Sequence, residues 1–197
     1  MTQHDLFGDA PGPAANAPHV RGPWAQSRCD LFFALRPSID EARRIHAFAV
    51  ELLASHDVSG NVFAPERMHI TLEPIGADVD DAVVDTACRA ADTVSFSTLD
   101  VRFDAVMSFS GPLVLLGSDG TDEVRKLRTE LGCALADRGF RPRRAYEPHL
   151  TICYDAQRRV AKTPIEPIVF RVEAFALIKS HIGQSRHEVV RTWRLAG

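Results

Sequence analysis

Two stretches of the chain share one pattern, Met68-His69-Ile70-Thr71-Leu72 and Pro148-His149-Leu150-Thr151-Ile152. In each stretch His and Thr alternate with apolar residues, which is typical of a β-strand with one buried face. Because successive side chains of a strand point to opposite faces, His and Thr share one face and the apolar residues share the other. Each stretch therefore predicts a strand that presents an imidazole beside a hydroxyl, and two such strands could bracket one small group.

The alternative interpretation is that these are two ordinary strand histidines. In a chain with 8 His, a His two residues before a Thr can occur by chance. The apolar frame, however, is the same around both copies, and the copies fall at comparable positions in what read as two halves of the chain. This agreement favours a functional pair, with the rest of the chain as the scaffold that brings the two strands together.

Composition sets limits on the class of protein. The chain has 197 residues, of which 45% are hydrophobic and 25% charged, as in an ordinary soluble domain or two small lobes. Its net charge of -3 argues against non-specific binding of nucleic acid by the whole surface. A polyanion would therefore have to bind at a local basic patch. No apolar run is long enough to span a membrane, and the start of the chain lacks the apolar core of a signal peptide.

The cysteines and the remaining histidines do not predict a metal site. His181 and His187 lack the spacing that places two ligands on one helical face. The four cysteines are far apart and form no C-x-x-C pair, so we expect a reduced, cytoplasmic protein that binds no metal and no cofactor. These cysteines are Cys29, Cys88, Cys133 and Cys153.

The order of elements predicts an α+β fold. Residues 1–26 are rich in Pro, Ala and Gly and predict a flexible tail, followed by one domain over residues 27–197. Within that domain, apolar strand patterns and helical patterns interleave as β-α-β-β-α-β-β-α-β-β-β, with a polar loop over 155–167 and a single strand over 168–180. Many connections are of hairpin length, which favours antiparallel pairing.

The chain also has Leu31-Phe32-Phe33-Ala34-Leu35-Arg36-Pro37 near its start and Trp193-Arg194-Leu195 at its end. Together with the two motifs, in this order and over about residues 28–196, these features resemble the two-histidine (2H) phosphoesterases. The similar branch is the one named 2′-5′ RNA ligase or RNA 2′,3′-cyclic phosphodiesterase. The resemblance implies a bilobal α+β fold with two antiparallel sheets, outer helices and pseudo-twofold symmetry around a central cleft.

The resemblance also implies an activity, the metal-independent hydrolysis of an RNA or nucleotide 2′,3′-cyclic phosphate to a 2′-phosphomonoester, with 2′-5′ ligation as the reverse reaction. It implies that His69 donates a proton to the leaving 3′-oxygen, that His149 activates water, and that Thr71 and Thr151 grip the phosphate. Which imidazole is the acid depends on how the substrate lies. The chemistry is consistent, because two imidazoles that titrate near neutrality supply an acid and a base, and hydroxyls donate to charged oxygens.

The partners implied are RNA ends or nucleotide 2′,3′-cyclic phosphates, bound by a monomer. The family often has an Arg after the second motif, where this chain has Tyr154. The arginines just ahead of His149 are candidates to replace it, since Arg suits bidentate contact with phosphate. They are Arg138, Arg141, Arg143 and Arg144. We therefore take Arg143, Arg144 and Tyr154 as candidate substrate-binding residues, with a solvated charged loop as the alternative for the two arginines.

Regular alternation places two further side chains on the same face as the motif residues. Glu73 would lie beside Thr71 and repel a phosphate, unless the strand bends at Pro74 and turns the carboxylate aside. Cys153 would share the face of Thr151, but it has no evident base partner, so we expect it to be a packing residue.

Two other functions compete with the first. One keeps the chemistry and changes the substrate to a small cyclic nucleotide, an ADP-ribose cyclic phosphate or a 2′-5′ oligonucleotide. The other is an RNA-binding module that retains the cleft without turnover. Binding alone does not require two His and two Thr, so the complete quartet argues against the second alternative.

Overall fold

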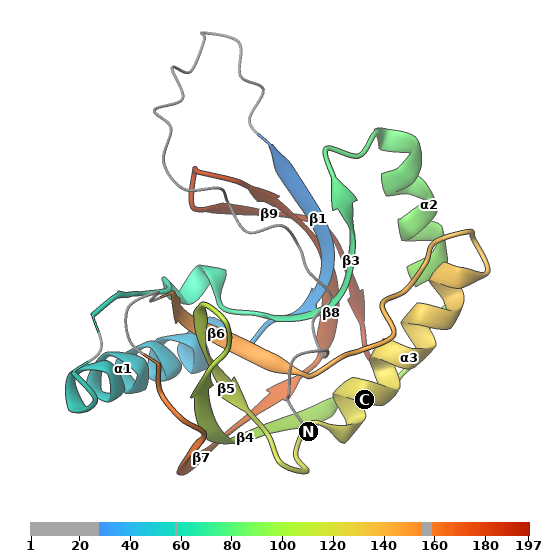
Figure 1. The fold of residues 1–197 in the computed structure, drawn as a ribbon. Helices are drawn as coiled ribbons and strands as arrows, with labels where there is room; N and C mark the ends of the chain where they lie inside the picture. The colour runs from blue at the N-terminus through green and yellow to red at the C-terminus, as the bar shows by residue number, and fades with distance from the viewer. Residues whose placement is uncertain (1–27, 58, 155–158) are drawn as a thin grey trace, which may run out of the picture.

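The computed structural model describes residues 28–57, 59–154 and 159–197. Its helices are α1 (Ile39–Ser55), α2 (Asp81–Ala91) and α3 (Asp122–Ala136), with a short 3₁₀ turn η1 (Pro65–Arg67). Its strands are β1 (Cys29–Leu35), β2 (Asn61–Val62), β3 (Ile70–Ala77), β4 (Leu99–Ser108), β5 (Pro112–Leu116), β6 (His149–Tyr154), β7 (Thr163–Val172), β8 (Ala174–His181) and β9 (Arg186–Arg194). The α+β class is thereby confirmed (Figure 1).

The structure leaves one expectation about the chain untested and contradicts another. The predicted tail, residues 1–26, lies outside the described residues, so its flexibility and the domain boundary at residue 27 stay predictions. The prediction of one strand over 168–180 after a loop that reaches residue 167 is wrong. The chain forms β7 from Thr163 and breaks at Glu173 before β8, because β7 pairs with β4 whereas β8 pairs with β1.

Hydrogen bonds join the strands into one nine-stranded sheet in the order β7-β4-β5-β6-β3-β1-β8-β9, with β2 added beside β6. All neighbouring strands in it are antiparallel, as predicted. The two separate sheets that the resemblance implied are not confirmed. The two halves of the sheet instead meet through a single residue pair, Ile70 opposite Leu150, where β3 lies next to β6.

Each half repeats the same unit of strand, helix and motif strand. In the first half β1 is followed by α1 and then β3, and in the second half β5 is followed by α3 and then β6. In both units the first strand pairs with the motif strand. The two units meet at equivalent residues, because Ile70 and Leu150 each follow the motif histidine. This arrangement agrees with pseudo-twofold symmetry about the Ile70–Leu150 pair.

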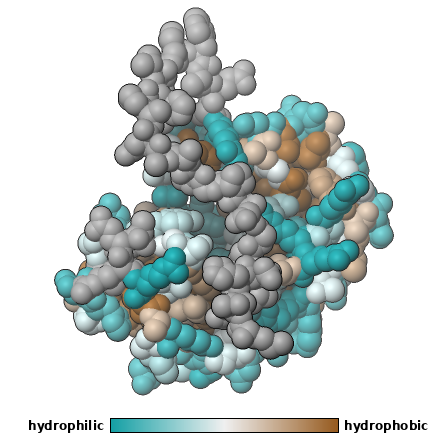
Figure 2. Space-filling view, in the orientation of Figure 1, coloured by the Kyte–Doolittle hydropathy of each residue, from teal (hydrophilic) through white to brown (hydrophobic). Residues whose placement is uncertain are grey.

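Local sequence signals explain the helices. Ser38 and Glu41 form a capping box at the start of α1, and Asp80 accepts a hydrogen bond from the Val83 amide at the start of α2. Apolar residues at helical spacing bury one side of each helix, as in α3, whose stripe includes Leu127 and Leu131. Hydrophilic side chains project from the outer side of α3 in Figure 2, as this amphipathic pattern requires.

All three helices contribute to one large apolar cluster with the sheet residues that point away from the motif His and Thr. Helices α1 and α3 each reach the motif strand of the other half. Helix α1 follows β1 but contacts β6, and α3 follows β5 but contacts β3 as well as β4 of its own half, while α2 packs beside α3. Each motif strand is therefore supported from behind by the helix of the other half.

A β-bulge follows the Thr of each motif. In β3, Thr71 lies opposite Ala34 and Glu73 lies opposite Phe33, so Leu72 is the extra residue. In β6, Thr151 and Cys153 lie opposite consecutive residues of β5, so Ile152 is extra in the same way. A bulge shifts the alternation by one residue and is often found beside functional sites.

The bulges overturn two expectations from regular alternation. Glu73 does not share the face of His69, because the bulge at Leu72 turns its carboxylate to the helix side, one residue before the bend expected at Pro74. Cys153 does not share the face of Thr151 and is buried in the main cluster, where it is a packing residue as expected. The motif face is thus cleared of the carboxylate that would repel a phosphate.

Glu73 forms a buried network that ties the second motif to the first. Its carboxylate accepts from Arg128 of α3 at 2.7 Å and from the Arg143 amide at 2.9 Å. Arg128 also donates to the Arg143 carbonyl and lies over the ring of Tyr146, whose hydroxyl donates to the carbonyl of Thr71 at 3.0 Å. The segment that leads into His149 is therefore fastened to β3, the strand of the other motif.

Arg128→Met leaves the Glu73 carboxylate buried without its cation, and we expect it to remove roughly 3–5 kcal/mol of unfolding free energy in urea titrations. The double variant Glu73→Gln/Arg128→Met is expected to be more stable than Arg128→Met, because no buried charge is left unpaired. The control Arg43→Met changes an exposed Arg of α1 and should leave stability nearly unchanged. Equal stability of Arg128→Met and the control would contradict a buried pair.

Candidate active site

The strand register brings the two motifs together. Since Ile70 lies opposite Leu150 in antiparallel strands, the flanking residues face one another crosswise, His69 toward Thr151 and Thr71 toward His149. All four side chains lie on the face of the sheet opposite Ile70 and Leu150, away from the main cluster. The sequence pattern and the single central pair thus produce one group of two imidazoles and two hydroxyls.

Both imidazoles are oriented by the same backbone contact. The Nδ1–H of His69 donates to the carbonyl of Arg67, and the Nδ1–H of His149 donates to the carbonyl of Glu147, each at 2.7 Å. A carbonyl oxygen only accepts, so these bonds fix the tautomer and leave Nε2 of each ring to act on a ligand. The carbonyl partner is two residues ahead of the His in both motifs.

An aromatic ring packs against each imidazole. Phe32 of β1 stacks on His69 with ring centroids 5.0 Å apart, and Phe109, after β4, meets His149 edge-on at 5.0 Å. Phe32 belongs to a small apolar cluster on the motif face, and Phe109 packs against a second one. The two histidines therefore have limited freedom to rotate within the site.

Burial favours the neutral form of both imidazoles, because it lowers their pKa values. It lowers the pKa of His69 to about 4, an effect to which His149, Arg36 and Arg67 add and which the bond to the Arg67 carbonyl opposes. Burial also lowers the pKa of His149, against the opposing effects of its bond to the Glu147 carbonyl and of the Glu147 carboxylate. The two halves therefore differ in charge, with cations around His69 and a carboxylate near His149.

His187 of β9 is a third imidazole in the site, and the sequence patterns did not identify it. Its ring lies 5.2 Å from that of His69 and 5.9 Å from that of Phe32, centroid to centroid. Burial lowers the pKa of His187 to about 4, with further contributions from His69, Arg67 and Arg36. In the sequence the one notable feature of His187 is its spacing from His181, which does not fit two metal ligands on one helical face. The pairing of β8 with β9 alone brings it beside the first motif.

Two arginines of the site were also missed, Arg36 and Arg67. Arg36 follows β1 and donates to the carbonyl of Glu66 at 2.8 Å, and the guanidinium of Arg67 lies 4.4 Å from the ring centre of Phe63. The buried Nε of Arg67 has no hydrogen-bond acceptor among the described residues. A signal was present for Arg67, since superposing the two motifs places it at the position of Glu147, two residues before the His.

The predicted substrate-binding residues lie around the site rather than in contact with its histidines. Arg143 and Arg144 are exposed, and the backbone of Arg143 is bound to Glu73 and Arg128 on the helix side of the sheet. Tyr154 is 60% exposed at the end of β6, with its ring 5.5 Å from that of Phe63. Their roles in binding a substrate stay predictions.

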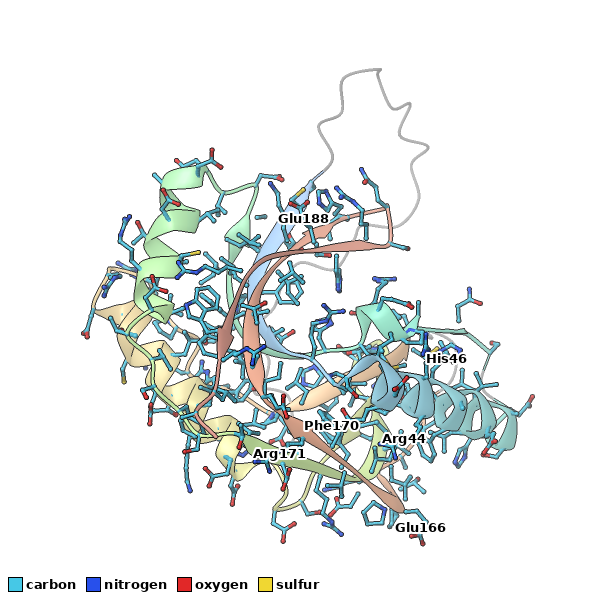
Figure 3. All side chains as sticks on the ribbon, turned by 180° about the vertical axis from the view of Figure 1, so that it is seen from behind. Arg44, His46, Glu166, Phe170, Arg171 and Glu188 are labelled. Carbon is cyan, nitrogen blue, oxygen red and sulfur yellow. The ribbon has the colours of Figure 1, made fainter. Side chains whose placement is uncertain are left out.

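The segment ahead of the first motif is held by the first helix. His46, labelled on α1 in Figure 3, donates its Nδ1–H to the carbonyl of Phe63 at 2.9 Å. The amide of Phe63 in turn donates to the carbonyl of Ile152 in the second motif strand, also at 2.9 Å. This segment continues into η1, which carries Arg67 and delivers the carbonyl that orients His69.

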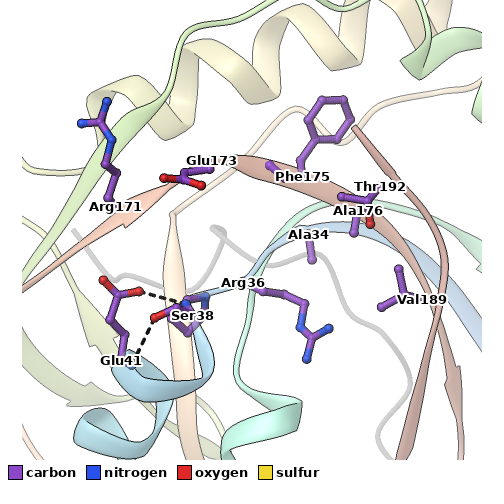
Figure 4. Close-up of a pocket in the computed structure, with 12 residues that line it drawn as sticks. Ala34, Arg36, Ser38, Glu41, Arg171, Glu173, Phe175, Ala176, Val189 and Thr192 are labelled. Carbon is purple, nitrogen blue, oxygen red and sulfur yellow. Dashed lines mark hydrogen bonds between the residues drawn. The ribbon is translucent and has the colours of Figure 1, made fainter. Parts of the chain in front are cut away.

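A groove of about 440 Å³ lies beside the quartet, at the end of β1 (Figure 4). It contains neither motif histidine, and it shares Arg36 with the cationic side of the site. Its lining consists of Ala34, Arg36, Pro37, Ser38, Glu41, Arg171, Glu173, Ala174, Phe175, Ala176, Val189 and Thr192.

The part of the chain that the structure describes shows neither a cluster of metal ligands nor a helix that could span a membrane. Among its residues, no group of three or more His, Cys, Asp or Glu lies close enough together to hold a metal ion. None of the helices in this part of the chain is both long and apolar enough to cross a membrane.

The low pKa of His69 predicts a loss of stability in acid. The unfolded chain, with its ordinary His pKa of 6.5, binds more protons than the folded protein between pH 6.5 and about 4. The unfolding free energy should therefore fall as the pH drops through this window and receive the full contribution above it, on the order of 3 kcal/mol from His69. Denaturant titrations of His69→Asn should show a shallower fall, whereas the exposed control His56→Gln keeps the original slope. An unchanged slope in His69→Asn would refute the buried neutral imidazole.

Comparison with solved structures shows the same fold. E.coli LigT complexed with 3′-AMP has a TM-score of 0.73 at 21% identity, covering 86% of this chain and 99% of that chain. TT0787 of Thermus thermophilus has a TM-score of 0.67 at 17% identity, covering 85% and 98%. The PDE domain of MHV ns2 is more distant, with a TM-score of 0.51 at 15% identity and coverage of 72% and 97%. No curated protein sequence matches the chain.

The sequence itself gives the family. The profile of the 2′-5′ RNA ligase superfamily matches residues 34–184, a span that contains both motifs, their bulges and the chain up to the turn before β9. This match covers most of the chain and agrees with the fold of the solved structures. The chain therefore belongs to the 2′-5′ RNA ligase superfamily.

Proposed function

We propose that the protein hydrolyses an RNA or nucleotide 2′,3′-cyclic phosphate to the 2′-phosphomonoester by acid-base catalysis with His69 and His149. The observation that carries the proposal is the pair of imidazoles, each with Nδ1 fixed on a backbone carbonyl and Nε2 left for a ligand, on one face with Thr71 and Thr151. E.coli LigT, which shares the fold, has been solved with 3′-AMP, ATP, NADP+ and phosphate, which supports a nucleotide or phosphate ligand at this site.

The reaction needs one imidazole in each protonation state. A neutral Nε2 takes a proton from water, the resulting hydroxide forms a bond to phosphorus, and the P–O3′ bond breaks as the other imidazolium protonates O3′. The hydroxyls of Thr71 and Thr151 donate to the non-bridging oxygens, whose negative charge grows in the transition state. The 2′-phosphate leaves with O2′ still bound to phosphorus, and the two histidines have exchanged protonation states.

The charges around the two imidazoles bear on which histidine donates the proton and which accepts it. The resemblance assigns the donor to His69 and the acceptor to His149, and with that division the anionic substrate must raise the pKa of His69 against Arg36 and Arg67. The reverse division is favoured by the resting charges, since Glu147 stabilises a cation at His149. A phosphodiester between the two rings favours both cations, so the pH-rate profile is expected to be bell-shaped in either case.

The activity is tested with adenosine 2′,3′-cyclic phosphate, the protein and EDTA, with the product isomer identified by NMR or chromatography. We expect the 2′-phosphate to form in the presence of the chelator, and each of His69→Gln and His149→Gln to lower kcat by about 10²–10⁴. The control is His56→Gln, which changes an exposed histidine at the end of α1.

Three outcomes would contradict the proposal. Loss of activity with EDTA would exclude the metal-independent mechanism, and a 3′-phosphate product would mean that the other ester bond breaks. Undiminished binding of the nucleotide without any turnover would favour the alternative of an RNA-binding module.

A sulfur-substituted substrate assigns the donor. When sulfur replaces the bridging 3′-oxygen, the leaving thiolate needs no proton, so the variant that lacks the proton donor should regain most of its rate. We expect rescue of His69→Gln and none of His149→Gln, and the opposite pattern would establish the reverse division of roles.

A further inference from the structure

The two halves of the motif face differ in the size of their side chains. In the first half the register carries one row across four strands, from Thr71 of β3 to Ala34 of β1, Ala176 of β8 and Thr192 of β9. Side chains of directly paired residues point to the same face, so this row is a strip of small residues that begins at a motif threonine.

The equivalent row in the second half is filled. From Thr151 of β6 it runs to Val114 of β5 and Met107 of β4. Val114 lies at the core of an apolar cluster and Met107 packs against it. The strip of small residues is thus particular to the first half, and the groove of about 440 Å³ lies over it. This volume is within the roughly 300–1,000 Å³ typical of small-ligand pockets.

The charges along the groove change from one end to the other. In Figure 4 the guanidinium of Arg36 extends toward the side of Val189, whereas Glu41, Glu173 and Arg171 lie at the opposite side. Arg36 is also close enough to His69 and His187 to disfavour their protonation. The groove therefore has the cation Arg36 where it adjoins the histidines, and it has two carboxylates together with Arg171 at its other side.

This arrangement fits a nucleotide chain rather than a lone cyclic phosphate. Arg suits a phosphate, with which it forms paired charge-assisted hydrogen bonds. The carboxylates of Glu41 and Glu173 and the hydroxyls of Ser38 and Thr192 suit the ribose hydroxyls and exocyclic amines of a nucleoside. The apolar floor would lie under the sugar and base.

We propose that this groove is a substrate subsite for an oligonucleotide end, in which Arg36 binds the phosphodiester on the 5′ side of the reacting nucleotide and the groove holds the preceding nucleoside. The proposal rests on the proposed function, because it extends the same site. It makes the protein selective for RNA ends over nucleoside 2′,3′-cyclic phosphates, and it assigns that selectivity to residues outside the His-Thr quartet.

The test compares three substrates by kcat/KM: adenosine 2′,3′-cyclic phosphate, its 5′-phosphorylated form, and the dinucleotide ApA that ends in a 2′,3′-cyclic phosphate. We expect the dinucleotide to exceed the first by about tenfold or more, as one well-placed Arg–phosphate contact allows. The 5′-phosphorylated form should gain only the share due to the phosphate. Arg36→Gln should reduce the preference for both phosphorylated substrates, and Thr192→Phe, which fills the groove from the edge strand, should reduce that for the dinucleotide alone.

Matched controls are Arg43→Gln and Thr129→Phe, which change exposed residues of α1 and α3 and should keep the wild-type preference. Thermal unfolding verifies that each variant is folded. Calorimetric binding of the 2′-phosphate products, with and without the preceding nucleotide, repeats the comparison without turnover.

The outcomes separate the subsite from the function. If the wild type hydrolyses none of the three substrates, the proposed function fails. If it hydrolyses all three with equal kcat/KM, the function stands and the subsite is refuted. A preference that persists unchanged in Arg36→Gln and Thr192→Phe likewise refutes the subsite, and a preference fully supplied by the 5′-phosphate refutes the place given to the preceding nucleoside.

Discussion

The architecture depends on one backbone contact, the antiparallel pair of Ile70 and Leu150 that joins the two halves of the sheet. Because these residues occupy the same place in the two motifs, their pairing brings each histidine next to the threonine of the other motif. A shift of one residue in this register would move the side chains of one strand to the opposite face. The chain secures the register from behind, where the Glu73–Arg128 network and the hydroxyl of Tyr146 fasten the second motif segment to the first motif strand.

The backbone around the two motifs is symmetric, but the side chains around it differ in charge and volume between the halves. The bulges, the carbonyl contacts to Nδ1 and the neighbouring Phe rings recur in both halves. The residues that differ are those around this frame, such as Arg67 against Glu147 and Ala34 against Val114. A symmetric frame provides two chemically similar imidazoles, and its unequal surroundings place cations near His69 and a carboxylate near His149.

The alternation of His, Thr and apolar residues was sufficient to predict the motif strands, and the helical spacing was sufficient for the three helices. The match to the superfamily confirms the resemblance seen in the sequence. Period-two alternation failed after Thr71 and Thr151, because a bulge depends on the partner strand and is invisible in a single strand's pattern. His187 and Arg36 were missed for a similar reason, since strand pairing rather than sequence spacing brings them to His69. The single continuous sheet also depends on one long-range pair that no local pattern reveals.

The contacts of α1 and α3 with the motif strand of the other half have a consequence for folding. Since α1 supports the motif strand of the second unit and α3 contacts strands of both units, the two units share one apolar interior. The two units resemble the protomers of a domain-swapped dimer, here within one chain. Such a chain is expected to unfold in a single cooperative step. The two motifs are therefore expected to come together only when both halves have folded.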